Sequence, residues 1–517
     1  MTVTPRCADG HITGRVPGRE REMNIRQAKE EIKHTAQAYL AKDTSGEYRI
    51  PPIRQRPMLL MGPPGIGKTQ IMEQIARELG IGLVAYTITH HTRQSAVGLP
   101  FIREEIFDGE VRSVTEYTMS EIVASVYRKI RDGGQREGIL FIDEINCVSE
   151  TLAPTMLQFL QCKTFGNQAV PEGWIIVAAG NPPEYNKSVR EFDMVTLDRV
   201  RYLEVEADFQ VWKEYARAQH LHGGILSYLE LRQKNFYRVE ADVDGIQYVT
   251  ARGWEDLSNL METYESLDIP VDETVVREFV HHADIAEDAA AYLDLYRKYR
   301  DDYGIADILA GHARPEIYAR IYAAEFDERL SVVQLLLDGL GRHFASCAQT
   351  KYLTDAWYGF LKEYRAQVEA VPDPQACYRE MTEKRAEQYA LAKKNNSYSR
   401  DEARQQKLLM EYLKEYQPHS GRTPQDCFAE AKTGFDTQTS HLEQQEAGAA
   451  RALEHAFDFM EQAFSEGQEM VVFVTELTLN PEAALFLAEH TNERYLQYNQ
   501  KLLIGTRRAE LLSELAR

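Results

Sequence analysis

The chain lacks the features that mark secreted, membrane-spanning or zinc-binding proteins. None of its six cysteines belongs to a C-x-x-C pair, so the sequence predicts reduced thiols and no zinc site. Its longest apolar runs, such as 138–142 and 174–180, fall far short of the ~18 residues that a membrane-spanning helix needs. Residues 1–22 contain no apolar core of the kind that secretory signals carry. We therefore expect a cytoplasmic protein.

Positive charge is also scarce. The chain has 59 Lys and Arg against 80 Asp and Glu, which gives a formal net charge of −21 at pH 7. A general nucleic-acid binder normally shows a basic face, so this balance argues against that class but leaves room for a local basic channel. The remaining composition, 44% hydrophobic and 27% charged, is that of an ordinary globular protein. A length of 517 residues predicts about two to four domains.

One glycine-rich segment stands directly behind a short apolar run at 58–61, and it reads G-x-x-x-x-G-K-T. Glycines permit a tight turn that points successive backbone N–H groups at phosphate oxygens. The lysine adds positive charge for the β- and γ-phosphates, and the threonine hydroxyl can ligate Mg²⁺. Apolar residues at helical spacing follow, which predicts a helix whose N-terminus favours an anion. The sequence therefore predicts a nucleotide triphosphate site made by Gly62, Pro63, Pro64, Gly65, Ile66, Gly67, Lys68, Thr69 and Gln70.

Two carboxylates follow a second apolar run. Residues 138–142 are typical of a buried strand, and Asp143 and Glu144 come directly after it. Carboxylates at such a place are costly unless their charges are used. Asp143 suits the outer shell of Mg²⁺ together with Thr69, and Glu144 suits a base that orients the attacking water. A carboxylate that caps a nearby helix would explain one of these acids but not both.

A third apolar run, 174–179, leads into Gly180 and Asn181. An amide at the end of a buried strand can contact the γ-phosphate or hold the water. The alternative is a turn-forming asparagine before proline, which is common. Further strands are predicted at 83–88 and 200–205, and the Asp-Gly and Gly-Asn pairs at 108–109 and 166–167 predict hairpins.

These five strands, with the motifs GPPGIGKT, LFIDE, AAGNPP and LDR in this order, resemble the AAA+ ATPases. The inserted hairpins and the segment VTARGWE at 249–255 resemble the MoxR-type branch, whose members work with von Willebrand factor A partners. The resemblance covers roughly residues 24–300. It implies an α/β fold with a P-loop core, a five-stranded parallel sheet and a helical lid, with ATP and Mg²⁺ bound by a homo-hexameric ring. In proteins of this layout the connector before the P-loop lines the adenine pocket, which makes Ile50 and Ile53 candidates.

The resemblance also implies roles for three residues outside the two carboxylates. Asn181 matches sensor 1, Arg199 matches the arginine finger that reaches the γ-phosphate of the neighbouring subunit, and Arg252 matches sensor 2. A guanidinium suits these places because it is planar and always charged. Arg201 is a possible substitute for Arg199, and a surface salt bridge is the alternative role for either. Ala251 stands where relatives often carry proline before the sensor 2 arginine.

The resulting prediction has four parts: a disordered tail (1–23), an AAA+ α/β core (24–206), a helical lid (207–303) and an all-α extension (304–517) of unknown role. We expect an ATP-hydrolysing ring that remodels or activates a protein client. A nucleic-acid motor is one alternative, and the acidic balance weighs against it. A nucleotide-gated scaffold that does not hydrolyse ATP is another, and the complete set of catalytic residues weighs against that.

Overall fold

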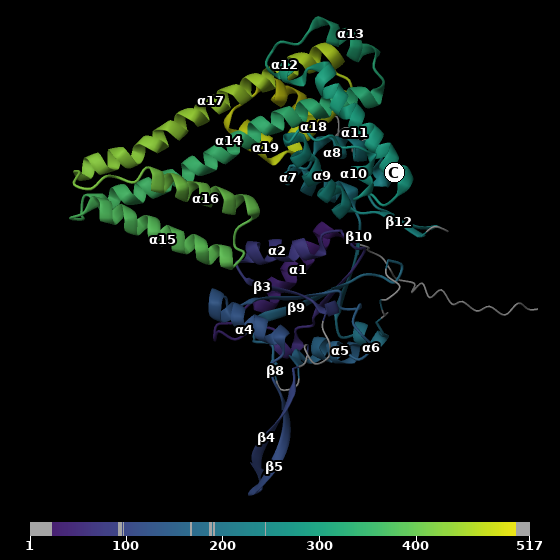
Figure 1. Ribbon diagram of the computed structural model, residues 1–517, viewed down its shortest axis with the longest axis vertical. Coiled ribbons are helices and arrows are strands. Elements are labelled where there is room, and N and C mark those ends of the chain that lie inside the picture. Colours follow the sequence, from purple (N-terminus) through teal and green to yellow (C-terminus); the bar gives the residue numbers. More distant parts are fainter. Residues whose placement is uncertain are drawn as a thin grey trace, which may run out of the picture.

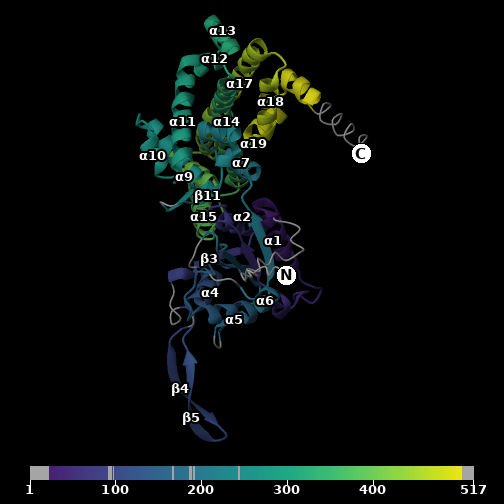
Figure 2. The same cartoon turned by 90° about the vertical axis from the view of Figure 1, so that its right-hand side faces the viewer.

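The computed structural model describes residues 23–90, 96, 98–165, 168–185, 189, 192–242 and 245–502. An α/β part lies in the middle of the molecule, with a long two-stranded hairpin projecting from one end and a large helical part at the other (Figures 1 and 2). The chain runs through these parts in order, because the sheet and its helices end near residue 206 and the helical part follows.

A parallel sheet forms the centre of the α/β part. Its strand order is β1-β10-β2-β9-β6-β3, and all of its neighbouring strands are parallel. The bounds are β1 Met23–Asn24, β2 Met58–Met61, β3 Gly82–Thr87, β6 Gly138–Asp143, β9 Trp174–Gly180 and β10 Arg201–Glu206. Five of these strands match the prediction. The sixth, β1, has two residues that pair with the end of β10, too few to produce a sequence pattern.

Helices cover both faces of the sheet, which explains why its central strands are apolar throughout. Alternate side chains of β6 enter two different cores, Ile139 and Phe141 on one face and Leu140 and Ile142 on the other. The first face is covered by α1 (Ile25–Leu40) and α2 (Lys68–Leu79), and the second by α4 (Glu121–Gly133) and α5 (Ala153–Cys162). The expected α/β class is confirmed.

The register of the parallel strands brings the motifs together. Met61 at the end of β2 pairs with Gly180 at the end of β9, and β9 pairs on its other side with β6. The P-loop, Asp143 and Asn181 therefore leave three neighbouring strands at the same edge of the sheet. This is the edge at which open α/β sheets bind their ligands.

Both expected hairpins are present. Strands β4 (Pro100–Phe107) and β5 (Glu110–Tyr117) pair antiparallel along their full length, and both turn residues, Asp108 and Gly109, have positive φ, as two-residue hairpin turns require. The second hairpin consists of β7 (Thr164–Phe165) and β8 (Gln168–Ala169). Its predicted turn, at 166–167, lies outside the described residues.

The helical part begins after β10. Its lid section consists of α7 Phe209–Ala218, α8 Gly223–Leu231, α9 Ala251–Ser266, α10 Glu273–Arg277 and α11 Ala283–Tyr303. Between α8 and α9 this section also contains an antiparallel hairpin of β11 (Arg238–Asp242) and β12 (Gly245–Val249), which the expectation of a helical lid did not include. In the sequence, polar and apolar residues alternate there on both sides of an Asp-Gly pair at 244–245, a hairpin pattern that the sequence analysis did not use.

The extension is helical among the residues that the structure describes. Its helices up to residue 489 are α12 Ile305–Leu309, α13 Pro315–Ala323, α14 Phe326–Val368, α15 Pro374–Lys394, α16 Arg400–Glu415, α17 Pro424–Phe464, α18 Gln468–Leu479 and α19 Pro481–Glu489, and residues 493–502 are also helical. One hydrophobic core joins lid residues such as Trp254 to extension residues such as Phe457. A second, smaller core around Trp357 holds α15 and α16 against α14 and α17. The domain boundary at 303–304 stays a prediction, and the side chains on its two sides share one core.

Within the described chain, no single helix is long and apolar enough to cross a membrane. Helices α18 and α19 together have the required length and composition, but an 85° bend separates them.

Candidate nucleotide-binding site

The P-loop wraps around its own lysine. Gly65 and Gly67 have positive φ values of 75° and 92°, which turn the chain so that α2 begins at Lys68. The Lys68 Nζ donates hydrogen bonds to the carbonyl oxygens of Gly62 (2.7 Å) and Pro63 (2.8 Å). Burial is the main cause that lowers the pKa of Lys68 to about 8; the charge of Asp143 opposes this shift and that of Arg252 adds to it.

Two side-chain hydrogen bonds connect the P-loop to the ends of the neighbouring strands. Lys68 Nζ donates to Asn181 Oδ1 at 2.8 Å, and Thr69 Oγ1 donates to Asp143 Oδ2 at 3.0 Å. The three motifs that the sequence singled out therefore meet in one site.

Glu144 follows Asp143 with φ at +58°, a conformation that non-glycine residues rarely adopt. The Glu144 N–H donates to Asp143 Oδ1 at 2.9 Å. Such backbone strain is concentrated at functional sites, because the surrounding structure must hold it in place. The backbone therefore leaves the extended conformation at Glu144, directly after the last residue of β6.

The oxygen atoms of Thr69 and Asp143 fit a magnesium site. Both are hard ligands of the type that Mg²⁺ prefers, and their hydrogen bond shows that the two side chains converge. A cation between them would lie beside the phosphates that the P-loop N–H groups are placed to hold.

Asn146 is a positioning residue that the sequence reasoning missed. Its side chain is only 2% exposed. Its Nδ2 donates to the carbonyl oxygen of Asn181 at 2.7 Å, and its Oδ1 accepts from the Asn181 N–H at 3.3 Å. Gly180 makes room for this contact, because a Cβ there would lie 2.6 Å from Asn146 Oδ1. The available signal was a third polar residue shortly after Asp143 and Glu144.

The lid places Arg252 beside the P-loop of its own chain. Thr250 caps α9 by accepting from the Gly253 N–H, which supplies the helix start that the missing proline would have marked. A Cβ on Gly65 would lie 3.2 Å from the Thr250 Cβ and 3.4 Å from the Arg252 Cβ. Tyr237, also in the lid, donates from its hydroxyl to the Pro64 carbonyl oxygen at 2.9 Å.

Arg199 and Arg201 lie in different environments. Arg201 is held against α1, where its Nη1 donates to Thr35 Oγ1 at 2.7 Å and its guanidinium pairs with Glu31. Arg199 is exposed and its Nη1 donates to Gln161 Oε1 on α5 at 2.7 Å. Among the described contacts, Arg199 makes none with the P-loop of its own chain. The guanidinium of Arg201 is therefore engaged with α1, whereas Arg199 lies at the surface.

A family model for AAA domains of the dynein-related subfamily matches residues 57–200. This segment is similar to AAA domains. The match supports an AAA+ ATPase and covers the P-loop, Asp143, Glu144, Asn181 and Arg199. It spans well under half of the chain and leaves Arg252 and the extension outside. A comparison with curated proteins gave no match.

A cavity of about 490 Å³ adjoins the P-loop of this AAA domain. Residues 65–67 and the first half of α2 form one wall, and the starts of α1 and α9, the side of α7, residues 206–208, Leu479 and Pro481 form other parts. Ile50 and Ile53 do not line it, and Ile53 is 93% exposed. The connector turns away because Gln55 Nε2 binds the carbonyl oxygens of Ile50 and Tyr39, both at 2.9 Å.

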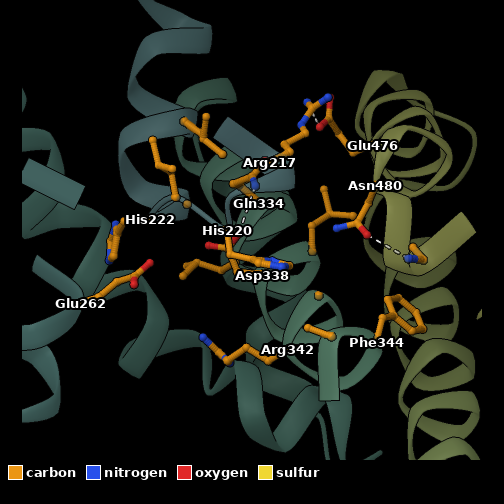
Figure 3. A pocket seen from close by; sticks show the side chains of 18 of the residues that line it. Arg217, His220, His222, Glu262, Gln334, Asp338, Arg342, Phe344, Glu476 and Asn480 are labelled. Atoms are coloured by element: carbon orange, nitrogen blue, oxygen red, sulfur yellow. Dashed lines mark hydrogen bonds and ion pairs between the residues drawn. The ribbon is translucent and has the colours of Figure 1, made fainter. Parts of the chain in front are cut away.

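Figure 3 shows a second cavity, of about 550 Å³, between the lid and the extension. Asp338 lies in it and accepts hydrogen bonds from Tyr296 (2.6 Å) and Gln334 (3.1 Å). Burial raises the pKa of Asp338. This cavity contains no P-loop residue, whereas residues 65–67 of the P-loop line the first cavity.

Proposed function

We propose that the chain is an ATP-hydrolysing AAA+ ATPase of the MoxR-type branch. It works as a homo-hexameric ring that remodels or activates a protein client with a von Willebrand factor A partner. The observation that supports it most directly is the pair of hydrogen bonds that joins Lys68 to Asn181 and Thr69 to Asp143. These contacts support the proposal because they join the side chains expected to bind phosphate, Mg²⁺ and the attacking water.

Each residue has a distinct task in this proposal. The P-loop N–H groups hold the phosphate chain, and Lys68 exchanges its carbonyl partners for β- and γ-phosphate oxygens. Thr69 and Asp143 would hold Mg²⁺, which would supply positive charge to neutralise the phosphates. Glu144 orients the water and accepts its proton as the water oxygen bonds to the γ-phosphorus and the bond to ADP breaks. Asn181, fixed by Asn146, orients the γ-phosphate and the water.

In this proposal Arg252 and Arg199 both stabilise the negative charge that develops on the phosphates during hydrolysis. Arg252 is on the lid and faces the P-loop of its own chain. Arg199 is exposed and lies at the end of α6 (Met194–Leu197). Met194 and Val195 beside it are 83% and 53% exposed. An exposed apolar pair next to an exposed arginine suits contact with a second copy, whose phosphates the arginine would reach.

The β4–β5 hairpin supports action on a protein. It projects from the AAA domain on the side away from the lid (Figures 1 and 2). Ile102, Ile106 and Val111 on it are 76%, 73% and 64% exposed. Exposed aliphatic side chains on a projecting hairpin are suited to contact with apolar protein segments.

Two substitutions test the ATPase assignment. Lys68→Ala should abolish ATP binding, because it removes the buried charge that faces the phosphates. Glu144→Gln should bind ATP but lose turnover by about 10²-fold or more, as expected for removal of a catalytic base. Binding and steady-state phosphate release measure the two effects. Glu383→Gln, the same change at an exposed site on α15, is the matched control.

Tight ATP binding by Lys68→Ala, or normal turnover by Glu144→Gln, would contradict the assignment. The Glu144→Gln variant, kept in the presence of ATP, also serves in an affinity pull-down to capture the client and the proposed partner. Turnover that rises on addition of DNA would favour the nucleic-acid motor instead.

A further inference from the structure

The corner between α18 and α19 belongs to the extension, yet it lies at the nucleotide cavity. Leu479 and Pro481 line the same 490 Å³ cavity as residues 65–67 of the P-loop. They come from a region outside the AAA domain match. Leu479 is 49% exposed, so an apolar side chain is left partly uncovered beside the proposed ATP site.

Hydrogen bonds at the two helix ends and a proline determine the shape of this corner. Helix α18 ends where the Asn480 N–H donates to the Glu476 carbonyl oxygen at 3.0 Å. The Asn480 side chain then caps α19 by accepting from the Ala483 N–H at 2.9 Å. Pro481 occupies the first helical position, where its missing N–H costs nothing. The 85° bend between the helices therefore presents Leu479 and Pro481 in a defined orientation.

A buried ion cluster ties the corner to the lid. Glu476, one turn before Leu479, is 8% exposed. Its carboxylate pairs with Lys213 at 3.1 Å and with Arg217, both on α7. Figure 3 shows the contact between Arg217 and Glu476, with Asn480 close by. Separating such a buried pair would leave an uncompensated charge, so the contact between α18 and α7 is costly to break.

Helix α7 supplies the adjoining wall of the cavity. Trp212 and Tyr215 on this helix both line it. Trp212 is 8% exposed, and its Nε1 has no hydrogen-bond partner among the described residues. Tyr215 is held by its hydroxyl, which donates to Glu255 at 2.9 Å and accepts from Gln70 at 3.2 Å. The cavity thus has the P-loop on one wall, aromatic and aliphatic side chains of α7 and the corner on another, and charged side chains such as Lys29, Glu214 and Glu255 on the rest.

We propose that the α18–α19 corner completes the nucleoside subsite of the ATP site, with Leu479 and Pro481 packed against the base. The inference rests on the proposed ATPase function. The separation of the cavity into a P-loop wall and an aromatic and aliphatic wall supports the proposal. A triphosphate needs N–H groups and charge, whereas a planar base needs apolar and aromatic surface. The extension then belongs to the nucleotide site, and its position affects the affinity for ATP.

The test compares two probes on the full chain carrying Glu144→Gln, which suppresses turnover. Inorganic tripolyphosphate reports the phosphate subsite alone, and ATP reports both subsites. Leu479→Ala should weaken ATP binding about five- to tenfold, as expected for loss of a partly buried leucine, and should leave tripolyphosphate binding unchanged. Leu479→Met, which keeps the apolar volume, should bind ATP as the parent does. Leu485→Ala, at a 64% exposed leucine of α19 outside the cavity, is the matched control.

The outcomes separate this inference from the proposed function. If Lys68→Ala abolishes binding of both probes but Leu479→Ala changes neither, the ATP site stands and the corner has no part in it. Equal weakening of ATP and tripolyphosphate by Leu479→Ala would also overturn the inference, because it would show a general disturbance of the site. If Lys68→Ala binds both probes normally, the proposed function itself fails.

Discussion

Lys68 shows how burial prepares a charged group for a ligand. Its ammonium group donates to two P-loop carbonyl oxygens and to Asn181. These neutral partners replace only part of the hydration that burial removes, so the pKa falls to about 8. A bound triphosphate would add negative charge beside the ammonium group to that of Asp143 and Glu144, and would hold the proton on Lys68.

This shift makes ATP binding depend on pH. Below pH 8 Lys68 is charged before ATP arrives, whereas above pH 8 it is neutral and must take up a proton on binding. The Kd for ATP should therefore rise above pH 8, by up to about tenfold per pH unit. Calorimetry between pH 7 and 9.5, in buffers with different ionisation enthalpies, should show proton uptake only at the alkaline end. Binding without proton uptake at pH 9 would contradict the low pKa of Lys68.

Asn146 and Glu144 show that neighbours in the sequence can have different physical tasks. Glu144 adopts a strained backbone conformation at φ +58°, whereas Asn146 satisfies both backbone groups of Asn181. In the proposed function Glu144 would act on the attacking water, whereas Asn146 only fixes the backbone of Asn181.

At the scale of elements, the extension touches the AAA domain at a second place, the C-terminal end of α4. Asn395, just after α15, donates from its Nδ2 to the Gly133 carbonyl oxygen at 3.1 Å. Lys129 on α4 donates to the Lys394 carbonyl oxygen at 3.1 Å. Figure 1 shows the α15–α16 end reaching back toward the α/β part. The contact offers a hydrogen-bond donor to a carbonyl group at the end of α4, where intrahelical partners run out.

Removing this contact should loosen α4 locally. Asn395→Ala should lower the local stability of residues 129–134 by about 1 kcal/mol, the usual net contribution of one hydrogen bond. Faster hydrogen exchange of these amides, with little change in the melting temperature, is the expected result. Lys393→Ala, at an exposed neighbouring position, should leave the exchange unchanged. Unaltered protection in Asn395→Ala would show that the end of α4 does not depend on the extension.

At the scale of the whole molecule, the lid and the extension share one hydrophobic core. They are therefore expected to move together when nucleotide changes the position of the lid. The AAA domain has its own two cores on either side of the sheet. Such a division suits a motor, because two internally rigid bodies can change their relative position around a ligand held between them.

In the proposed ring, the exposed Arg199 of one subunit would act at the ATP site of its neighbour. Arg199→Ala subunits keep an intact P-loop, and Lys68→Ala subunits keep an intact Arg199. Each should be inactive alone, and mixing them should restore part of the ATPase rate at interfaces where Arg199 of one subunit meets Lys68 of another. A mixture of Lys68→Ala with the double variant Lys68→Ala/Arg199→Ala should show no recovery. If verified mixed assemblies of the two single variants stay inactive at every ratio, Arg199 does not act in trans.

The sequence by itself determined the strands, the phosphate loop and the residues that follow each strand. These features are local: a P-loop needs glycines at fixed spacing, and a buried parallel strand needs a continuous apolar run. Asp143 and Asn181 could be named in advance because parallel strands deliver their carboxyl ends to one edge. The β11–β12 hairpin shows the limit of this reasoning, because its alternating pattern lies within a region whose neighbours are all helical.

The tertiary structure decided everything that depends on residues far apart in the chain. Arg201 is occupied because α1 packs beside β10. Asn146 matters because β6 and β9 are neighbours. Leu479 follows the P-loop by more than 400 residues in the sequence. It lines the 490 Å³ cavity beside the P-loop because Glu476 joins α18 to α7. Sequence patterns report which face of an element is apolar, whereas only the packed fold reports what that face meets.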